Sequence, residues 1–180
     1  MINGARKEKI EMPKLLRAVQ ATWLSFDKEK WTLLGKDMDS MSMSLNPSVD
    51  TKQNILGETI VEHSGYTPEL SVDTYMAREE DAIYPNLQDI AMNRKMDDTS
   101  TSAYLMEAIL TDEVKNSDTA TLTGKAWIEN VIVVPQEYGG DTNGFAIPFN
   151  VHMNGGRTEG TVSVTKRVPT FTENGADGTS

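Results

Sequence analysis

The clearest pattern in the chain is an alternation of apolar and polar residues in its last third. From residue 145 to 153 every second side chain is large and apolar, which predicts a strand with one buried face. Extended back to residue 143, this strand would span about 36 Å at roughly 3.3 Å per residue. Pro148 has no N–H for a ladder, so we expect an edge position or a bulge there. Asn154, Gly155 and Gly156 tolerate positive φ and predict a hairpin to a return strand, 159–168.

Shorter stretches predict further strands. Residues 121–134 alternate at first and become apolar on both faces, which is typical of a strand covered on both sides by another element or another subunit. Residues 136–144 contain one Gly-Gly pair (139–140) and one Asn-Gly pair (143–144), and these pairs predict a loop. A charged turn separates two apolar segments that should form a hairpin. The two arms of that hairpin are 21–26 and 31–34, and the remaining predicted strands are 38–45, 66–76 and 104–110.

Only one internal stretch has the spacing of a long helix. Ile83, Leu87 and Ile90 recur at helical intervals, and residues 79–81 are acids of the kind favoured at a helix N-terminus. Pro85 is tolerated only in the first turn, so the helix should begin between residues 81 and 84. The sequence therefore predicts a mainly β fold of the α+β class, with one flanking helix packed on a sheet.

A polar connection of twenty residues, 46–65, joins two of the predicted strands. Connections of this length inside a compact domain are usually functional or disordered. This one also carries apolar side chains that do not suit a solvated loop, and we expect them to contact a neighbouring copy of the chain. The residues assigned to this inter-subunit or inter-ring loop are Asn46, Pro47, Val49, Asn54, Ile55, Leu56, Ile60 and Val61.

Composition and charge narrow the classes of function. The chain has 180 residues, which suits one domain, and no cysteine, which excludes disulfides and thiolate chemistry. Its formal net charge of −10 opposes the basic surface that grips nucleic acid. Residues 1–17 nevertheless hold five bases against two acids, whereas residues 60–118 hold thirteen acids against four bases. We expect a basic N-terminal arm (1–19), either solvated or attracted to another copy, a β domain (20–172) and a flexible tail (173–180).

The sequence offers little catalytic chemistry. Neither His63 nor His152 lies in a triad context, and the acidic clusters lack the spacing of a cation-binding loop. We therefore expect no catalytic residue, no cofactor and no metal. No apolar run is long enough to span a bilayer, and the N-terminus lacks the apolar core of a signal peptide. Trp23, Trp31 and Trp127 are interpreted as core or interface anchors, the alternative being a platform that stacks on sugars.

Several short sequence patterns follow one another along the chain in a characteristic order. WTLLG (31–35) ends the first hairpin and is followed by MSMSLNPSVDTKQNILGE (41–58), SGY (64–66) and DAIY (81–84). AWIENV (126–131) and YGGDTNGFAIPFNVHMNGG (138–156) then lead into GTV (160–162). In this order they resemble the major tail tube proteins of long-tailed, siphovirus-like bacteriophages of Gram-positive hosts. The resemblance covers roughly residues 20–172 and rests on the joint order of loose patterns.

The resemblance implies a β-sandwich or barrel that assembles as hexameric rings, which stack into a hollow tube for DNA ejection. The long loop would reach a neighbouring subunit or ring. Implied partners are other copies of the chain and the tape measure, tail terminator and baseplate or tail-tip proteins. The subunit would assemble in the host cytoplasm and reside in the tail of the virion, with no membrane partner. DNA would slide past an acidic lumen, for which the candidate residues are Glu107, Asp112, Glu113 and Asp118.

Other readings stay open at this point. The inner tube of a contractile tail or of a tail-like bacteriocin would share the fold. A monomeric β-sandwich that binds carbohydrate is an alternative of another class, and it would stay monomeric in size-exclusion chromatography at high concentration. An enzyme has no residue in the sequence that argues for it.

Overall fold

The computed structural model describes residues 14–36 and 41–175. Residues 1–13 of the predicted basic arm, residues 38–40 of the predicted strand 38–45, and residues 176–180 of the predicted tail lie outside the described part. The prediction of a mainly β fold is confirmed. The strands are β1 (Gln20–Ser25), β2 (Thr32–Leu34), β3 (Ser42–Ser44), β4 (Pro47–Gln53), β5 (Thr59–Tyr66), β6 (Glu69–Val72), β7 (Ser102–Leu110), β8 (Leu122–Pro135), β9 (Gly139–Asp141), β10 (Gly144–Ala146), β11 (Phe149–Met153), β12 (Thr158–Thr165) and β13 (Val168–Glu173). The helices are α1 (Tyr84–Asn93) and α2 (Asp98–Thr101), with 3₁₀ turns η1 (Arg17–Val19) and η2 (Val114–Asp118).

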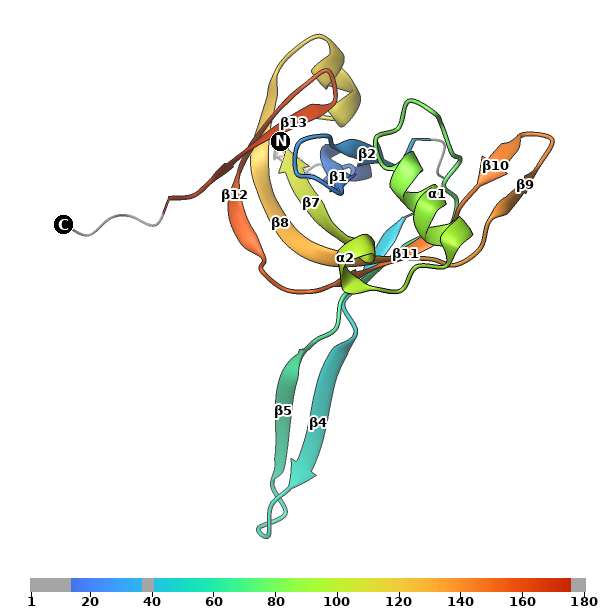
Figure 1. Ribbon diagram of the computed structural model, residues 1–180. Coiled ribbons are helices and arrows are strands. Elements are labelled where there is room, and N and C mark those ends of the chain that lie inside the picture. Colours follow the sequence, from blue (N-terminus) through green and yellow to red (C-terminus); the bar gives the residue numbers. More distant parts are fainter. Residues whose placement is uncertain (1–13, 37–40, 176–180) are drawn as a thin grey trace, which may run out of the picture.

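Most strands belong to one curled antiparallel sheet (Figure 1). It has nine strands, ordered β2-β1-β7-β8-β11-β6-β3, with β12 and β13 attached through β8. The fourteen-residue β8 is the spine of this sheet. β7 pairs along one side of β8, while β11 and β12 follow one another along the other side. The long strand thus joins two halves of the molecule.

The junction between β11 and β12 corrects the hairpin predicted between residues 145–153 and 159–168. Both strands pair with β8, and residues 154–157 face only residues 129–130, which makes a wide bulge. Gly155 and Gly156 have the expected positive φ, 81° and 71°. The Asn130 N–H donates to the Gly155 carbonyl at 3.0 Å. Local sequence specifies positive φ here, but the neighbouring strand determines whether the chain reverses or bulges.

The actual reversal joins β12 to β13 at Lys166 and Arg167, which have φ of 50° and 66°. No glycine marks this turn, and tertiary contacts hold it. The Lys166 N–H donates to the Ser117 carbonyl at 2.7 Å, and the Arg167 N–H donates to Ser117 Oγ at 2.9 Å. Arg167 also binds Asp118 at 2.8 Å. These contacts offset the cost of left-handed backbone at two side-chain-bearing residues.

The strand predicted over residues 143–153 is divided at Pro148. This residue has no N–H for the ladder, and its carbonyl accepts a hydrogen bond from the Gln136 N–H at 2.8 Å. β11 lies between β8 and β6, so the predicted edge position is wrong. The region predicted as a loop, 136–144, contains β9, which pairs with β10 as a separate small hairpin.

Other predicted elements are present. β1 and β2 form the first hairpin, in which Thr22 faces Leu34. Segments 104–110 and 121–134 form β7 and β8. Among the described residues 41–45 of the first of two further predicted strands, β3 is the paired part. The other, 66–76, is divided: Tyr66 ends β5, β6 covers Glu69–Val72, and Met76 forms an isolated bridge with Ala146.

Helix α1 begins within the predicted window and has Pro85 in its first turn. The acids of residues 79–81 lie before that turn, so they do not cap it. Asp81 instead accepts a hydrogen bond from Tyr75 Oη at 2.9 Å, and burial together with this bond raises the pKa of Tyr75. Arg94 ends the helix with a left-handed φ of 50°. The short α2, capped by Asp97, was not predicted.

Two hydrophobic cores lie on opposite faces of the sheet. Successive residues of β1 belong to different cores, since Leu24 packs with Leu87 of α1 and Phe149 of β11, whereas Trp23 packs with Val162 of β12. Trp23 is fully buried, and its Nε1 donates to the Arg167 carbonyl at 3.0 Å. β1 is therefore covered on both faces, and the curled sheet serves as a partition between the cores.

Candidate assembly surface

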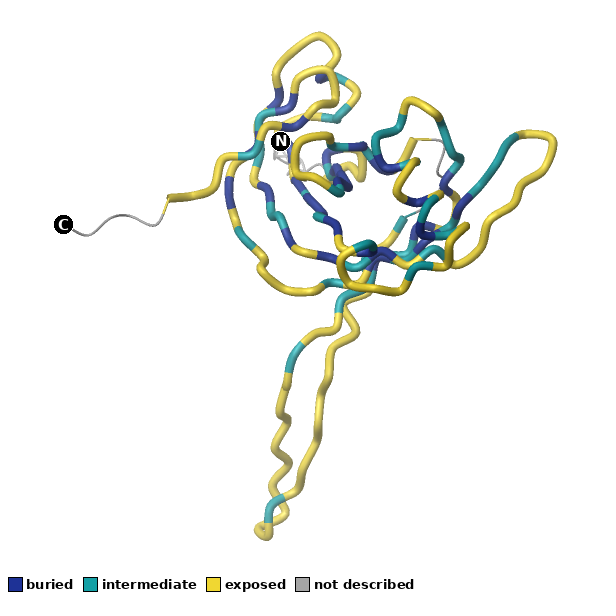
Figure 2. The backbone as a smooth tube through the Cα atoms, in the orientation of Figure 1, coloured by how far each residue is buried: buried dark blue, intermediate teal, exposed yellow. Residues whose placement is uncertain are grey.

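A two-stranded arm, formed by β4 and β5, projects from the sheet into solvent (Figures 1 and 2). Every residue of β4 is exposed, as is every residue of β5 except Gly65. The arm continues the pairing of β3 and β6: Ser44 faces Glu69 and Pro47 faces Tyr66 in the same register. One bulge follows the Ser48 pair. The arm is thus an extension of the end of the sheet.

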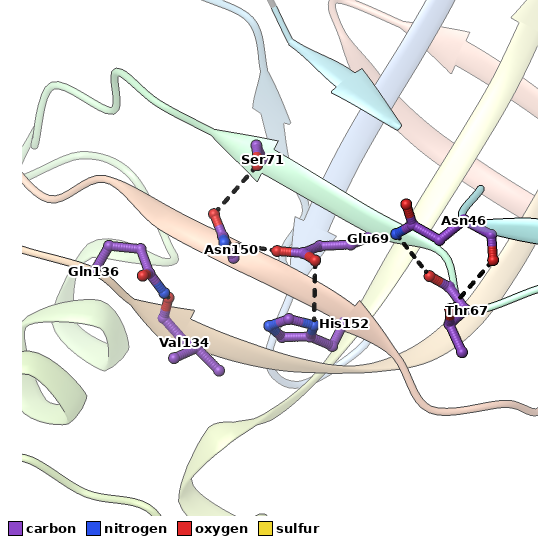
Figure 3. Close-up of polar contacts among 8 residues, drawn as sticks. All are labelled: Asn46, Thr67, Glu69, Ser71, Val134, Gln136, Asn150 and His152. Carbon is purple, nitrogen blue, oxygen red and sulfur yellow. Dashed lines mark hydrogen bonds and ion pairs between the residues drawn. The ribbon is translucent and has the colours of Figure 1, made fainter. Parts of the chain in front are cut away.

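The base of the arm is fastened by Asn46 and Thr67 (Figure 3). Asn46 Nδ2 donates to the Thr67 carbonyl at 3.1 Å, and Thr67 Oγ1 donates to the Asn46 carbonyl at 3.3 Å. Next to this base, Asn150 Nδ2 donates to Glu69 Oε1 at 2.7 Å, which joins β11 to β6. His152 Nδ1 lies 4.0 Å from Glu69 Oε2. These contacts fix the direction in which the arm leaves the sheet.

The register of the arm divides its side chains between two faces. Val49 is paired with His63 and Thr51 with Val61, so these four side chains share one face. Val49 and Val61 are exposed on it. The other face carries the charged residues of the arm strands together with one isoleucine, namely Asp50, Lys52, Ile60 and Glu62.

The charged face is unevenly compensated. Lys52 Nζ binds Glu62 Oε2 at 2.6 Å, although both side chains are more than half exposed. Asp50 stands directly opposite Glu62 and has no cationic partner within the described residues. Like charges on directly opposed residues are unfavourable, so this face gains from a cation brought by another molecule.

The tip of the arm is an ordered turn around Asn54. Its Oδ1 accepts hydrogen bonds from the Leu56 N–H at 3.0 Å and the Glu58 N–H at 2.9 Å. Its Nδ2 donates to Glu58 Oε2 at 2.7 Å. The turn holds Ile55 and Leu56 outward, with 103% and 77% of their surface exposed. A polar scaffold thus presents two apolar side chains to solvent.

The eight residues predicted for the inter-subunit loop all lie in this arm or at its base. The segment predicted as a long polar loop is a hairpin, and the prediction is corrected in this respect. The sequence did contain evidence for a hairpin, because two segments of strand length, 49–53 and 59–63, flank a turn from Asn54 to Gly57. The contact of these residues with a neighbouring copy stays a prediction.

The four candidate lumen acids fall into two groups. Asp112 and Glu113 directly precede η2 and Asp118 ends it, whereas Glu107 lies within β7. Glu113 binds Lys115 at 2.6 Å, and Asp118 binds Arg167. Asp112 accepts hydrogen bonds from Asn116 Nδ2 and the Glu113 N–H, which hold its pKa below the usual range. Much of the negative charge of this region is therefore locally compensated.

Glu107 belongs to a separate cluster with Glu129 and Arg157. The guanidinium of Arg157 binds Glu129 at 2.8 Å and Glu107 at 3.3 Å, and it lies 5.8 Å from the ring centre of Trp127. Partial burial alone would lower the pKa of Arg157, but the two carboxylates raise it above the usual value. This cluster connects the bulge after β11 to β7 and β8, a structural function that the sequence did not reveal.

The described residues contain no group of three or more His, Asp or Glu side chains placed to hold a metal. Within the same residues no helix has the length and apolar character needed to cross a bilayer. Trp31 packs against the second core, the one that contains Trp23 and Val162, and Trp127 is half-buried beside Arg157. Together with the buried Trp23, they form no exposed row of rings.

Comparisons with known proteins add a structural likeness. No protein-family model matches the chain, and no curated protein matches it. Among solved structures, the cryo-EM structure of the anti-feeding prophage cap, described as the tube-terminating cap, is similar over 88% of this chain and 98% of that one. The sequence identity is 12% and the TM-score is 0.49.

Proposed function

We propose that the chain is a structural subunit of a phage tail tube, which assembles as hexameric rings stacked into a hollow conduit for DNA ejection. The arm is the observation that carries this proposal. A two-stranded hairpin is marginally stable alone in water, and this one has Val49, Val61, Ile55 and Leu56 exposed. Burial of these side chains on another copy would stabilise both the arm and the assembly.

Further support comes from the open edges of the sheet. β2, β3 and β13 each pair with a single neighbour in the described chain, which leaves backbone groups free for strand pairing between copies. The resemblance noted in the sequence points to the same kind of assembly. The net charge of −10 suits a conduit that DNA passes without being held. The proposed partners are further copies, the tape measure, the tail terminator and the tail-tip proteins, in the tail of the virion.

Negative-stain electron microscopy of the purified chain at increasing concentration tests this function. We expect rings or tubes with a central channel, formed by the chain alone or after addition of tail-tip proteins that initiate assembly. A chain that stays monomeric under both conditions, in size-exclusion chromatography and on the grid, contradicts the proposal.

A further inference from the structure

A groove of about 600 Å³ lies where η1, β1 and β2 meet η2. Apolar side chains, among them Leu33, Leu34 and Val114, line part of it. Cationic side chains surround them, and none of the described residues that line the groove is acidic. We call this surface the basic groove, and its cationic residues are Arg17, Lys36, Lys115 and Arg167.

Two of these four cations have acidic partners in their own chain. Lys115 binds Glu113, and Arg167 binds Asp118. The guanidinium of Arg17 instead donates to the Gln20 carbonyl at 2.9 Å, and Lys36 has no acidic partner among the described residues. The basic groove therefore combines apolar contact area with two positive charges that no described acid neutralises.

The arm has the complementary chemistry. Ile55 and Leu56 stand out from its tip, and Glu58 lies beside them with Asn54 as its hydrogen-bond partner. Asp50, further along the arm, has no cation of its own in the described chain. The arm thus offers two apolar side chains and two acids to a surface that offers apolar side chains and two bases, and none of these four charges has an ion-pair partner among the described residues.

The direction of the arm keeps it away from the basic groove of its own chain. Met41, which lines the groove, directly precedes β3, and β3 runs from there to the base of the arm. β4 then continues outward for seven residues, about 23 Å at roughly 3.3 Å per residue. In Figure 1 the tip lies far from β1 and β2. Arm and groove therefore lie far apart on one molecule, which is the arrangement of a head-to-tail contact, in which the arm of one copy engages the groove of the next.

We propose that the basic groove receives the arm tip of a second copy of the chain, with Ile55 and Leu56 against Leu33 and Val114. Glu58 then lies near Lys36 or Arg17. This inference rests on the proposed function, because it names the surface through which successive subunits of the tube engage. Its occupant is a second copy, since apolar and charged groups of the arm match those of the groove.

Disulfide trapping tests the contact directly, because the chain has no cysteine to give unwanted pairs. Leu56→Cys and Lys36→Cys proteins are prepared separately, mixed, allowed to assemble and oxidised. We expect a covalent dimer of one chain of each kind when the assembled mixture is oxidised, and no covalent dimer when the mixture is diluted to monomers before oxidation. Arg94→Cys replaces Lys36→Cys in the matched control, since Arg94 is an exposed base that lines a different groove, between the helices and β8.

A charge-reversal series provides an independent measurement. Glu58→Lys and Lys36→Glu should each cause loss of tubes at low salt, whereas a chain that carries both changes should recover them. Glu137→Lys, at an exposed acid outside the arm, should leave assembly unchanged.

The outcomes separate the two proposals. If wild-type tubes form but Leu56→Cys pairs with Arg94→Cys, with itself or with neither variant, the groove assignment is overturned and the tube function stands. Loss of tubes in Glu58→Lys without recovery in the double variant has the same meaning. If the wild type forms no higher-order assembly, the proposed function and this inference fall together.

Discussion

The side chain of Arg157 connects three separate parts of the sheet. It lies in the bulge between β11 and β12, yet it binds the carboxylates of Glu107 in β7 and Glu129 in β8. The Glu129 side chain is only 11% exposed, and Arg157 is its cationic partner. Deleting the base would leave two poorly solvated acids close together, which costs more than the ion pair itself contributes.

We therefore expect Arg157→Leu to lower the free energy of unfolding by about 1–2 kcal/mol at pH 7, toward the small end of such effects because the guanidinium is half exposed. Urea denaturation followed by tryptophan fluorescence measures the change. Lys125→Met, at an exposed base outside the cluster, is the control and should change stability little. Equal stability of both variants would show that the cluster is not structural.

Acid should weaken the fold through its turn-forming aspartates. Hydrogen bonds from the Lys30 and Glu29 N–H groups lower the pKa of Asp27, and the Ser100 N–H lowers that of Asp97. A carboxyl group with a lower pKa in the folded state adds stability above its unfolded pKa of about 3.9, and this stability disappears as pH falls through the folded value. Urea midpoints measured from pH 6 to pH 2.5 should decline below about pH 4, less steeply in Asp27→Asn.

Asp112 is the best residue with which to test the lumen. Glu107, Glu113 and Asp118 have cationic partners, so reversing their charge would also disturb the fold. Asp112 is exposed and held by Asn116. If it faces the conduit, Asp112→Lys should slow DNA ejection from particles that still assemble. Ejection at the wild-type rate from such particles would place Asp112 outside the channel.

At the scale of the element, the arm separates cleanly from the domain. Asn46 and Thr67 face each other at its base and remain paired if a short turn replaces residues 47–66. We expect this deletion, closed by Asn-Gly, to keep the wild-type circular dichroism and unfolding midpoint but to lose tube formation. Deletion of residues 47–62 should give the same result with more disorder, because it leaves residues 63–66 without their partners. Normal tubes from the closed deletion would remove the arm from the assembly.

Elements with strong local periodicity were predictable, and those that depend on distant partners were not. Ile83, Leu87 and Ile90 placed α1 because a helix buries its stripe wherever it packs. A hairpin was predicted where the β11–β12 bulge lies, and the β12–β13 turn was not predicted. Gly155 allows both a turn and a bulge, and Lys166 adopts positive φ only with Ser117 beside it. The arm residues were found, but their pairing was missed because exposed strands lack the apolar alternation of a core.

At the scale of the whole molecule, the sheet that separates the two cores also couples them. β1, β7 and β8 contribute side chains to both, so neither core can form without the strands of the other. Leu87→Ala in the first core and Val162→Ala in the second should each lower stability, by about 2–5 kcal/mol for the leucine. Calorimetry should show one cooperative transition in both variants. Two separate transitions would mean that the halves fold independently.

The pairing of β3 and β6 continues into the arm with a single register shift, at the bulge after Ser48, and this regular pairing has a consequence for the dimensions of the arm. Side chains alternate between faces with a period of two, so adding one residue to each strand would lengthen the arm by about 3.3 Å and turn the tip over. Adding two to each strand would lengthen it by about 6.6 Å and restore the original facing. The length of the arm can therefore change only in discrete steps if its tip is to keep the same orientation. In the proposed tube, a change in the distance between neighbouring subunits would have to be made in steps of two residues per strand, or the apolar and charged faces would exchange places.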